Sequence, residues 1–211
     1  MDWRRAGRRE IGDYISDHMQ GKLAEKAFAK MLEKKYGVLC ELDFEVRPGI
    51  QVTDESDIKR VIVGDEYMSP GLKVDVKATT PRAKYLLIDA REFENRKYDA
   101  YVLVTVDLPK DHLIRYLLPI CAHHLDLPED VLQHIGSLAS IEAEILGFAY
   151  REDIEERGML FRAGEWLPDP NNPRRKLVQL KVDNYGLPIT LLRKSEEEWQ
   201  DFVSRLCSTI S

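Results

Sequence analysis

The run Leu-Lys-Val-Asp-Val-Lys-Ala at residues 72–78 constrains this chain more than any other stretch. Apolar and charged residues alternate strictly along it. Alternation with a period of two is typical of a β-strand that has one apolar face. Asp75 and Lys77 are therefore expected to project from the same side of a sheet. Taken alone, this pair fits an ordinary ion pair on a strand as well as it fits a functional site.

The order of elements around this strand is the next constraint. A helix is expected to begin at Ile11 or Ser16 and to end at Tyr36, where Gly37 follows as a C-terminal cap. Three strands are then expected, at residues 38–46, 57–63 and 72–79. A short helix at residues 90–96 and a strand buried on both faces at residues 98–106 are expected to follow. The sequence therefore predicts the order helix, three strands, helix, strand.

The pattern after Pro109 is less regular. Residues 111–124 fit a helix or a strand, and 160–173 and 184–188 are predicted to form loops and turns. Helices are predicted at residues 129–140 and 195–207, the second with Ser195 as its N-cap, and strands at 141–150 and 177–182. We expect a single α/β (α+β) domain over residues 1–211. Its core, a central mixed sheet of about four strands flanked by helices, spans about residues 10–107, and a β-rich extension with a terminal helix follows.

Composition excludes several classes of protein. The 211 residues are 44% hydrophobic and 32% charged, which suits a globular domain with a charged surface. No apolar run approaches the roughly 20 residues of a membrane span. The basic residues at the N-terminus are not followed by the apolar stretch of a secretory signal. The three cysteines form neither a CxxC pair nor a disulfide framework. These features predict a cytoplasmic chain with no membrane partner.

The net charge of −6 excludes a protein that coats nucleic acid through its bulk charge. Local basic clusters are still present, and each fits either a solvated surface or part of an interface. They lie at residues 4–9, at Arg174, Arg175 and Lys176, and at Arg193 and Lys194.

Three carboxylates and one lysine stand at matched places on the predicted framework: Glu25, Asp57, Asp75 and Lys77. Glu25 lies at the edge of the apolar face of the first helix, one turn after Gly21, which would permit a close approach to a neighbouring backbone. Asp57 opens the second predicted strand. Antiparallel pairing would bring Asp57 beside Asp75, and a helix packed on that face would add Glu25.

Acidic side chains at this density repel one another unless a hard cation lies between them. Mg²⁺ suits one or two carboxylates together with waters and phosphate oxygens. Ordinary roles stay open for each residue. Glu25 could be a surface residue paired with Lys22, Asp57 could cap its strand, and Asp75 and Lys77 could form an exposed charged stripe.

With a helix glutamate, a strand aspartate and a D-x-K pair on the next strand, the chain resembles the PD-(D/E)XK nuclease superfamily. The matching residues are Gly21 to Glu25, Ser56 to Ile58 and Val74 to Lys77, within about residues 10–107. The resemblance implies a restriction endonuclease-like αβββαβ core. The sequence departs from the pattern at two positions: Ser56 replaces the name-giving proline, and Asp75 replaces the commoner glutamate.

The resemblance also implies roles for individual residues. Asp57 and Asp75 would be the principal metal ligands, together with the backbone carbonyl of Val76. Glu25 would bind the metal directly or through water, and Lys77 would be the catalytic lysine.

The implied activity is Mg²⁺-dependent hydrolysis of phosphodiester bonds, with Mn²⁺ as a possible substitute, and an endodeoxyribonuclease is the expected form. Nucleic acid, expected to be DNA, would be the partner, and cutting both strands would require a homodimer. The alternative is a catalytically idle module of the same fold that binds nucleic acid or scaffolds a protein complex. The sequence does not choose between DNA and RNA, or between endo- and exonuclease action.

Overall fold

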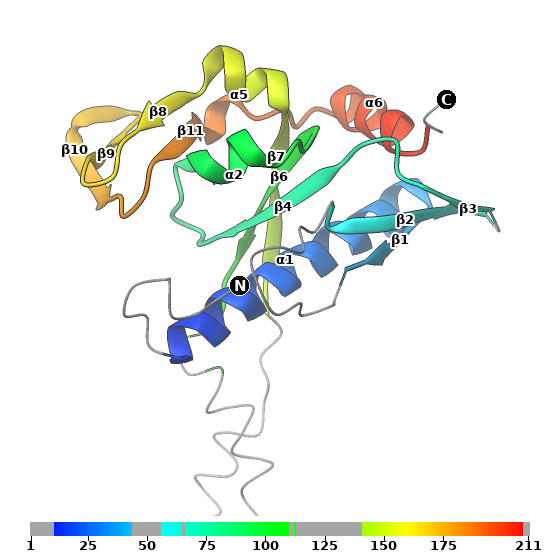
Figure 1. Cartoon of the computed structure of the whole chain (residues 1–211). Coiled ribbons are helices and arrows are strands. Elements are labelled where there is room, and N and C mark those ends of the chain that lie inside the picture. Colours follow the sequence, from blue (N-terminus) through cyan, green and yellow to red (C-terminus); the bar gives the residue numbers. More distant parts are fainter. Residues whose placement is uncertain (1–10, 44–55, 65, 110–111, 113–140, 209–211) are drawn as a thin grey trace, which may run out of the picture.

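The computed structural model describes residues 11–43, 56–64, 66–109, 112 and 141–208. The first half of the chain forms α1 (Ile11–Tyr36), β1 (Val38–Leu42), β2 (Ile58–Val63), β3 (Glu66–Met68), β4 (Val74–Thr79), β5 (Tyr85–Asp89), α2 (Ala90–Asn95) and β6 (Ala100–Val106). The second half forms β7 (Ala143–Tyr150), α5 (Arg151–Arg157), β8 (Met159–Phe161), β9 (Trp166–Asp169), β10 (Asn172–Gln179), β11 (Asn184–Pro188), a 3-10 turn η2 (Ile189–Leu191) and α6 (Glu196–Leu206). The fold is mixed α+β (Figure 1).

The strands form several small sheets, where one central sheet of about four strands was expected. The described sheets have the orders β1-β2-β3, β4-β6-β7, β5-β11-β8 and β9-β10. The sheet β4-β6-β7 is mixed, because β4 runs parallel to β6 and β7 runs antiparallel to it. β2 meets β4 only at its start, where the Asp57 N–H donates to the Val74 carbonyl at 3.0 Å, and then pairs with β1 and β3. The expected single sheet is therefore divided.

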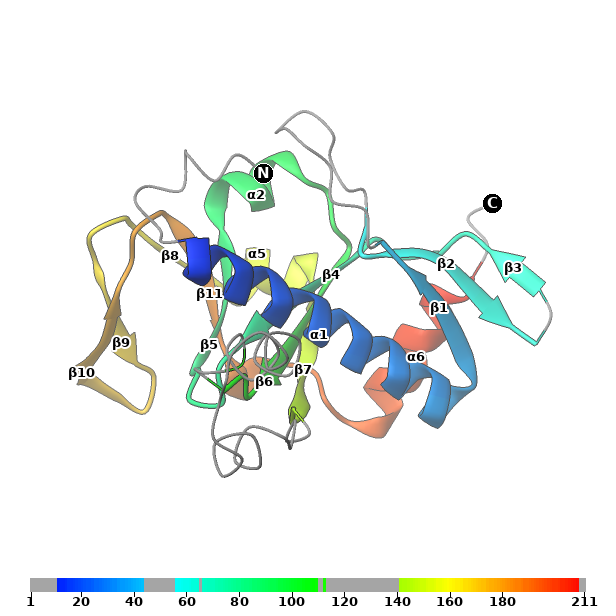
Figure 2. The same ribbon diagram turned by 90° about the horizontal axis from the view of Figure 1, so that it is seen from below.

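β6 is buried along its whole length and separates two apolar layers. Val102 and Val104 face a core that includes Phe28 of α1 and Phe202 of α6. The intervening residues, such as Leu103, face a second core built from α2, α5, β5 and β11. The two layers lie on opposite sides of the central sheet (Figures 1 and 2). The continuous apolar run of this strand is thereby explained, and its prediction is confirmed.

Aromatic side chains join the two terminal helices on one side of the sheet. The Phe28 ring lies 6.1 Å from that of Trp199 and 6.0 Å from that of Phe202, measured between centroids, and Phe148 of β7 lies 4.5 Å from Trp199. The predicted start of α6 is confirmed, since the Ser195 hydroxyl accepts a hydrogen bond from the backbone N–H three residues on.

The predicted first helix is also confirmed. α1 ends at Tyr36, and Gly37 follows with a φ of +69°, the left-handed conformation that a helix C-terminus commonly needs. No described helix has the length and apolar character that a membrane crossing requires.

Two predictions in the C-terminal half are wrong. Residues 160–173 contain β9 and the start of β10, and residues 184–188 form β11, the middle strand of its sheet. Gly186 suggested a turn, but a Cβ there would stand 2.8 Å from the Phe161 ring, so this glycine serves close packing between strands. The predicted segments at residues 111–124 and 129–140 lie outside the described residues, apart from His112.

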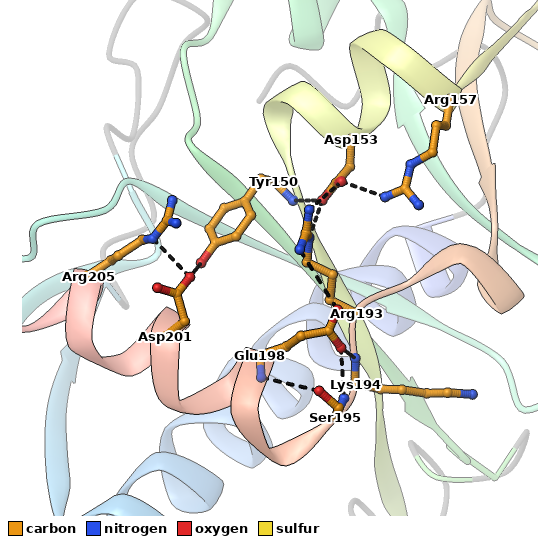
Figure 3. A network of polar contacts seen from close by, with 9 residues as sticks. All are labelled: Tyr150, Asp153, Arg157, Arg193, Lys194, Ser195, Glu198, Asp201 and Arg205. Atoms are coloured by element: carbon orange, nitrogen blue, oxygen red, sulfur yellow. Dashed lines mark hydrogen bonds and ion pairs between the residues drawn. The ribbon is translucent and has the colours of Figure 1, made fainter.

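A polar network holds α5 and α6 against the end of β7 (Figure 3). The Asp153 carboxylate accepts hydrogen bonds from Nε and Nη2 of Arg193, at 2.7 and 2.9 Å, and from the Tyr150 backbone N–H at 2.9 Å. Burial raises the pKa of this carboxyl, but these donors and Arg157 outweigh it and lower the pKa. On the other side, the Tyr150 hydroxyl donates to Asp201 at 3.1 Å.

We predict that Asp153→Ala lowers the free energy of unfolding by about 1–3 kcal/mol, because it leaves the buried Tyr150 N–H and the partly buried Arg193 guanidinium without this carboxylate. Asp153 is 4% exposed. Asp201→Ala is the matched control, since the Asp201 side chain is 50% exposed, and it should cost less than about 1 kcal/mol. Urea denaturation measures both, and equal losses would contradict the structural role of Asp153.

The expected close approach at Gly21 is wrong, because a Cβ there would meet no atom within 4 Å. Gly21→Ala should therefore raise the free energy of unfolding by about 0.5–1 kcal/mol through helix propensity. Gly71→Ala should lower it by about 1–3 kcal/mol, because its Cβ would stand 2.3 Å from the Arg205 carbonyl oxygen. A thermal melt of each variant tests the pair, and a shift in the same direction for both would contradict it.

Candidate active site

The candidate site lies at the edge of β4 that faces away from β6. There Asp57 donates its backbone N–H to the Val74 carbonyl, and its Oδ2 accepts the Val76 N–H at 2.6 Å. The N–H and C=O of one strand residue point to the same edge, so the Val76 carbonyl also points toward Asp57. The structure thus places the Asp57 carboxylate one residue from Asp75 along the edge of β4. Asp57 bonds across to another strand and does not merely cap its own.

Ser56 contributes to this arrangement in a way that a proline could not. Its hydroxyl accepts the Val74 N–H at 3.1 Å and donates to the Val74 carbonyl at 3.2 Å. It also accepts the Ile58 N–H at 3.3 Å. Where the family pattern has proline, this chain therefore has a serine whose hydroxyl makes specific hydrogen bonds to β4.

Asp75 and Lys77 project from the face of β4 that is directed toward α2, opposite the apolar face of this strand. Asp75 is 6% exposed, so the alternative of an exposed charged stripe is wrong. The Lys77 ammonium lies 2.8 Å from Asp75 Oδ2 and 2.8 Å from Oε2 of Glu92 in α2. Sequence reasoning missed Glu92. The helix that carries it was predicted, but its contact with Lys77 depends on how α2 packs against the sheet.

Glu25 is also buried, with 6% of its surface exposed. Both of its carboxylate oxygens accept hydrogen bonds from Lys22, at 2.9 and 2.8 Å, and the same ammonium donates to the Asp43 carbonyl at 2.6 Å. The alternative of a pair with Lys22 is therefore what the structure shows. The pair lies inside the protein, however, and not on its surface.

The expected position of the first helix is wrong in one respect. α1 packs on the apolar face of β4, where Val74 and Val76 join the core of Phe28, and not on the face that carries Asp75. Glu25 therefore approaches the other carboxylates from across the β4 edge. The charges of Glu25 and Lys77 both act on the pKa of Asp57, in opposite directions.

The three carboxyl groups raise one another's pKa values. Burial, followed by the charge of Glu25, raises the pKa of Asp57 to about 6. Burial raises the pKa of Asp75 to about 7, with Lys77 opposing the shift and Asp57 and Glu92 reinforcing it. Burial likewise raises the pKa of Glu25, against the opposing effect of Lys22. Carboxylates with such shifts cluster at functional sites more often than elsewhere.

Lys77 remains a cation at neutral pH. Burial alone would lower its pKa, but the charges of Asp75 and Glu92 outweigh burial and raise it. A lysine with a raised pKa holds its proton at neutral pH. Lys77 can therefore donate hydrogen bonds and neutralise charge, but it is not suited to act as a general base.

The oxygen atoms at this edge fit a hard divalent cation. Asp75 Oδ2 is buried, and the Lys77 ammonium lies 2.8 Å from it. The described residues contain no preformed group of three metal-ligating side chains. Asp57, Asp75 and the Val76 carbonyl would supply oxygen ligands of the kind and number that Mg²⁺ commonly takes from a protein. Glu25, held by Lys22, fits an outer position.

Comparisons with models of protein families, with curated proteins and with solved structures found no match to the chain. What the site does is therefore inferred from its own geometry.

The raised pKa values predict how stability depends on pH. Native Asp57 and Asp75 take up protons at higher pH than in the unfolded chain, where their pKa is near 3.8. Their contribution to stability is therefore fully present below about pH 4 and is lost as the pH rises through 6 to 7. Without divalent cations, Asp75→Asn should raise the free energy of unfolding at pH 7.5, by on the order of 1–3 kcal/mol, and flatten its pH dependence.

Mg²⁺ should reverse this loss. At pH 7.5 it should raise the melting temperature of the natural chain, but not that of Asp75→Asn, because binding to the native state alone stabilises it. Asp183→Asn is the control, since half-buried Asp183 lies outside the site and its pKa is lowered by hydrogen bonds from the Ala163 N–H and Arg162. Equal responses of the Asp75 and Asp183 variants would contradict a metal site at the β4 edge.

Proposed function

We propose that the chain is a Mg²⁺-dependent nuclease that hydrolyses phosphodiester bonds, and in its simplest form an endodeoxyribonuclease. One observation carries the proposal. Two carboxylates with raised pKa values lie side by side along β4: Asp57 accepts the Val76 N–H at the strand edge, and buried Asp75 contacts the Lys77 ammonium at 2.8 Å. Burying charged groups in this way costs stability. A bound cation and a phosphate would compensate these charges, which is why such an arrangement is typical of a functional site.

Each residue has a distinct part in this proposal. Asp57, Asp75 and the Val76 carbonyl would hold Mg²⁺, or Mn²⁺ in its place, with Glu25 in an outer position. Such a cation, when bound, lowers the pKa of water and polarises a phosphate.

Lys77 would donate hydrogen bonds to a phosphate oxygen and stabilise the negative charge that develops there. Glu92 is a positioning residue, because it fixes the Lys77 ammonium from the side opposite Asp75.

The order of elements supports the proposed family. Apart from the added strands β3 and β5, the chain runs α1, β1, β2, β4, α2, β6, which matches the αβββαβ order of a restriction endonuclease-like core. β4 and β6 are parallel and joined through α2, as that order requires. One site per chain implies that cleavage of both strands of a duplex needs two copies, so a homodimer belongs to the proposal.

One observation favours the second candidate, a catalytically idle module that binds nucleic acid or scaffolds a protein complex. Lysines already neutralise two of the three carboxylates, since Lys22 contacts Glu25 and Lys77 contacts Asp75. A module of this kind would need no divalent cation. Cleavage assays separate the two candidates.

The test is cleavage of supercoiled plasmid, branched DNA and single-stranded RNA with Mg²⁺, with Mn²⁺ and with a chelator. Lys77→Ala should reduce the rate by about 10²–10⁴-fold, because it removes a charge-stabilising donor from the site. Lys73→Ala is the matched control, since Lys73 is exposed and lies just before the same strand. It should keep the natural rate.

Circular dichroism should show that both variants are folded. Metal-independent cleavage, or equal rates for the two lysine variants, would exclude the proposed site. Absence of cleavage on all three substrates would favour the idle module.

A further inference from the structure

β10, which forms a hairpin with β9, is the most exposed of the described strands. All but one of the eight residues of β10 are exposed, so neither of its faces is covered along most of its length. Figures 1 and 2 show the hairpin at one end of the molecule, beyond β8 and β11. A two-stranded ribbon of this kind is marginal by itself, and it needs a reason to project from the body.

The hairpin is basic in a chain that is acidic overall. Residues 166–181 contain four basic residues and one acidic residue, a net charge of +3, against −6 for the whole chain. Arg174, Arg175 and Lys176 are consecutive and exposed. Of these three, only Arg175 lies near a described carboxylate, with 3.7 Å between its Nη1 and Oδ2 of Asp169. The cluster is therefore largely available to an anionic partner.

An exposed indole lies beside this charge. Trp166 is 47% exposed, and the Lys176 ammonium lies 5.8 Å from the centroid of its ring. Exposed tryptophan carries a large apolar area that most surfaces keep covered. An aromatic ring next to cationic side chains matches a nucleotide, which presents a flat base and a phosphate together.

The base of the hairpin is fixed to the body of the protein. Leu167 and Leu180 are buried against Tyr85 of β5. Backbone hydrogen bonds of 2.8 and 2.9 Å link Gly164 and Glu165 to Leu180. Trp166 is the direct neighbour of buried Leu167, so its ring projects from an anchored position.

We propose that the β9–β10 hairpin is a docking arm for an unpaired stretch of nucleic acid. A base would stack on Trp166, while Arg174, Arg175 and Lys176 would contact phosphates. An acidic peptide would satisfy the charges but would leave the indole without a planar partner, and a base in a duplex would have its faces covered. The inference rests on the proposed function for its choice of ligand.

The arm is joined to the candidate active site by a short route through the fold. β5 begins at Tyr85, at the base of the arm, and ends at Asp89, whose side chain caps α2. α2 carries Glu92, the partner of Lys77. β5 thus connects the base of the arm to the helix that carries Glu92.

The test is fluorescence anisotropy with a labelled DNA single strand of about 20 nucleotides, an RNA of the same sequence and the corresponding DNA duplex, all in a chelator. Replacing Arg174, Arg175 and Lys176 together by Gln should weaken binding of the single strands. It should also reduce the slope of log affinity against log salt by about 2. Trp166→Ala should weaken binding about 5- to 100-fold, and Trp166→Phe should restore much of the loss.

Matched controls remove the same features elsewhere. Replacing Lys26, Lys30 and Lys34 of α1 by Gln removes three exposed charges, and Tyr67→Ala removes an aromatic residue of β3 that is 69% exposed. Both should leave the affinity within about twofold of the natural chain. Equal losses in the controls, a preference for the duplex, or no binding to either single strand would overturn the inference. Relative affinities for DNA and RNA then identify the nucleic acid.

This experiment and the cleavage assay can fail separately. Binding is measured without divalent cations, so it reports on the arm and not on hydrolysis. Binding that depends on the arm, without cleavage, would exclude the proposed activity and leave the arm intact. Cleavage that is unaffected by the arm variants, with unchanged binding, would exclude the arm alone.

Discussion

The burial of β6 on both faces is the constraint on which the rest of the structure depends. A strand that is apolar on both sides needs cover on both sides, and here α1 and α6 supply one layer while α2, α5, β5 and β11 supply the other. Because β4 pairs with β6 in parallel register, the faces of β4 are decided at the same time. Val74 and Val76 join the first layer, and Asp75 lies on the side of Tyr101, in the second. The apolar core thus determines where the charged residues of β4 are placed.

The electrostatics of the candidate site follow from that placement. Asp75 is buried next to an apolar layer, and its charge is compensated by Lys77, which Glu92 holds in turn. Asp57 is stabilised differently, by the Val76 N–H at the strand edge, and Glu25 by Lys22. Three carboxylates therefore reach one small region from three elements, each with its own neutralising group. Burial raises the pKa values of Asp57 and Asp75, and these neighbouring groups offset the shift only in part.

Local sequence patterns predicted helices and strands. The predictions failed where the structure depends on packing between different elements. The periodicity of α1, the alternation of β4 and the capping by Ser195 depend on neighbours in the sequence, and each prediction is confirmed. The acidic residues were recognisable because Asp75 and Lys77 share one strand face. Glu92 was missed, since its contact arises only when α2 packs on the sheet. Gly186 misled the prediction of β11, because glycine marks close packing as well as turns.

Ser56 shows how a hydroxyl can fix the backbone beside a candidate metal ligand. Its hydroxyl bridges the N–H and the carbonyl of Val74, and so ties the residue before Asp57 to the edge of β4. Proline restricts a backbone by its ring, whereas serine here achieves a restriction through hydrogen bonds that the partner strand must provide. The restriction of the backbone then depends on two segments of the chain, the one that carries Ser56 and the strand that carries Val74, instead of on one residue. A search that requires proline at this position would pass over every chain that fixes the same edge with a hydroxyl.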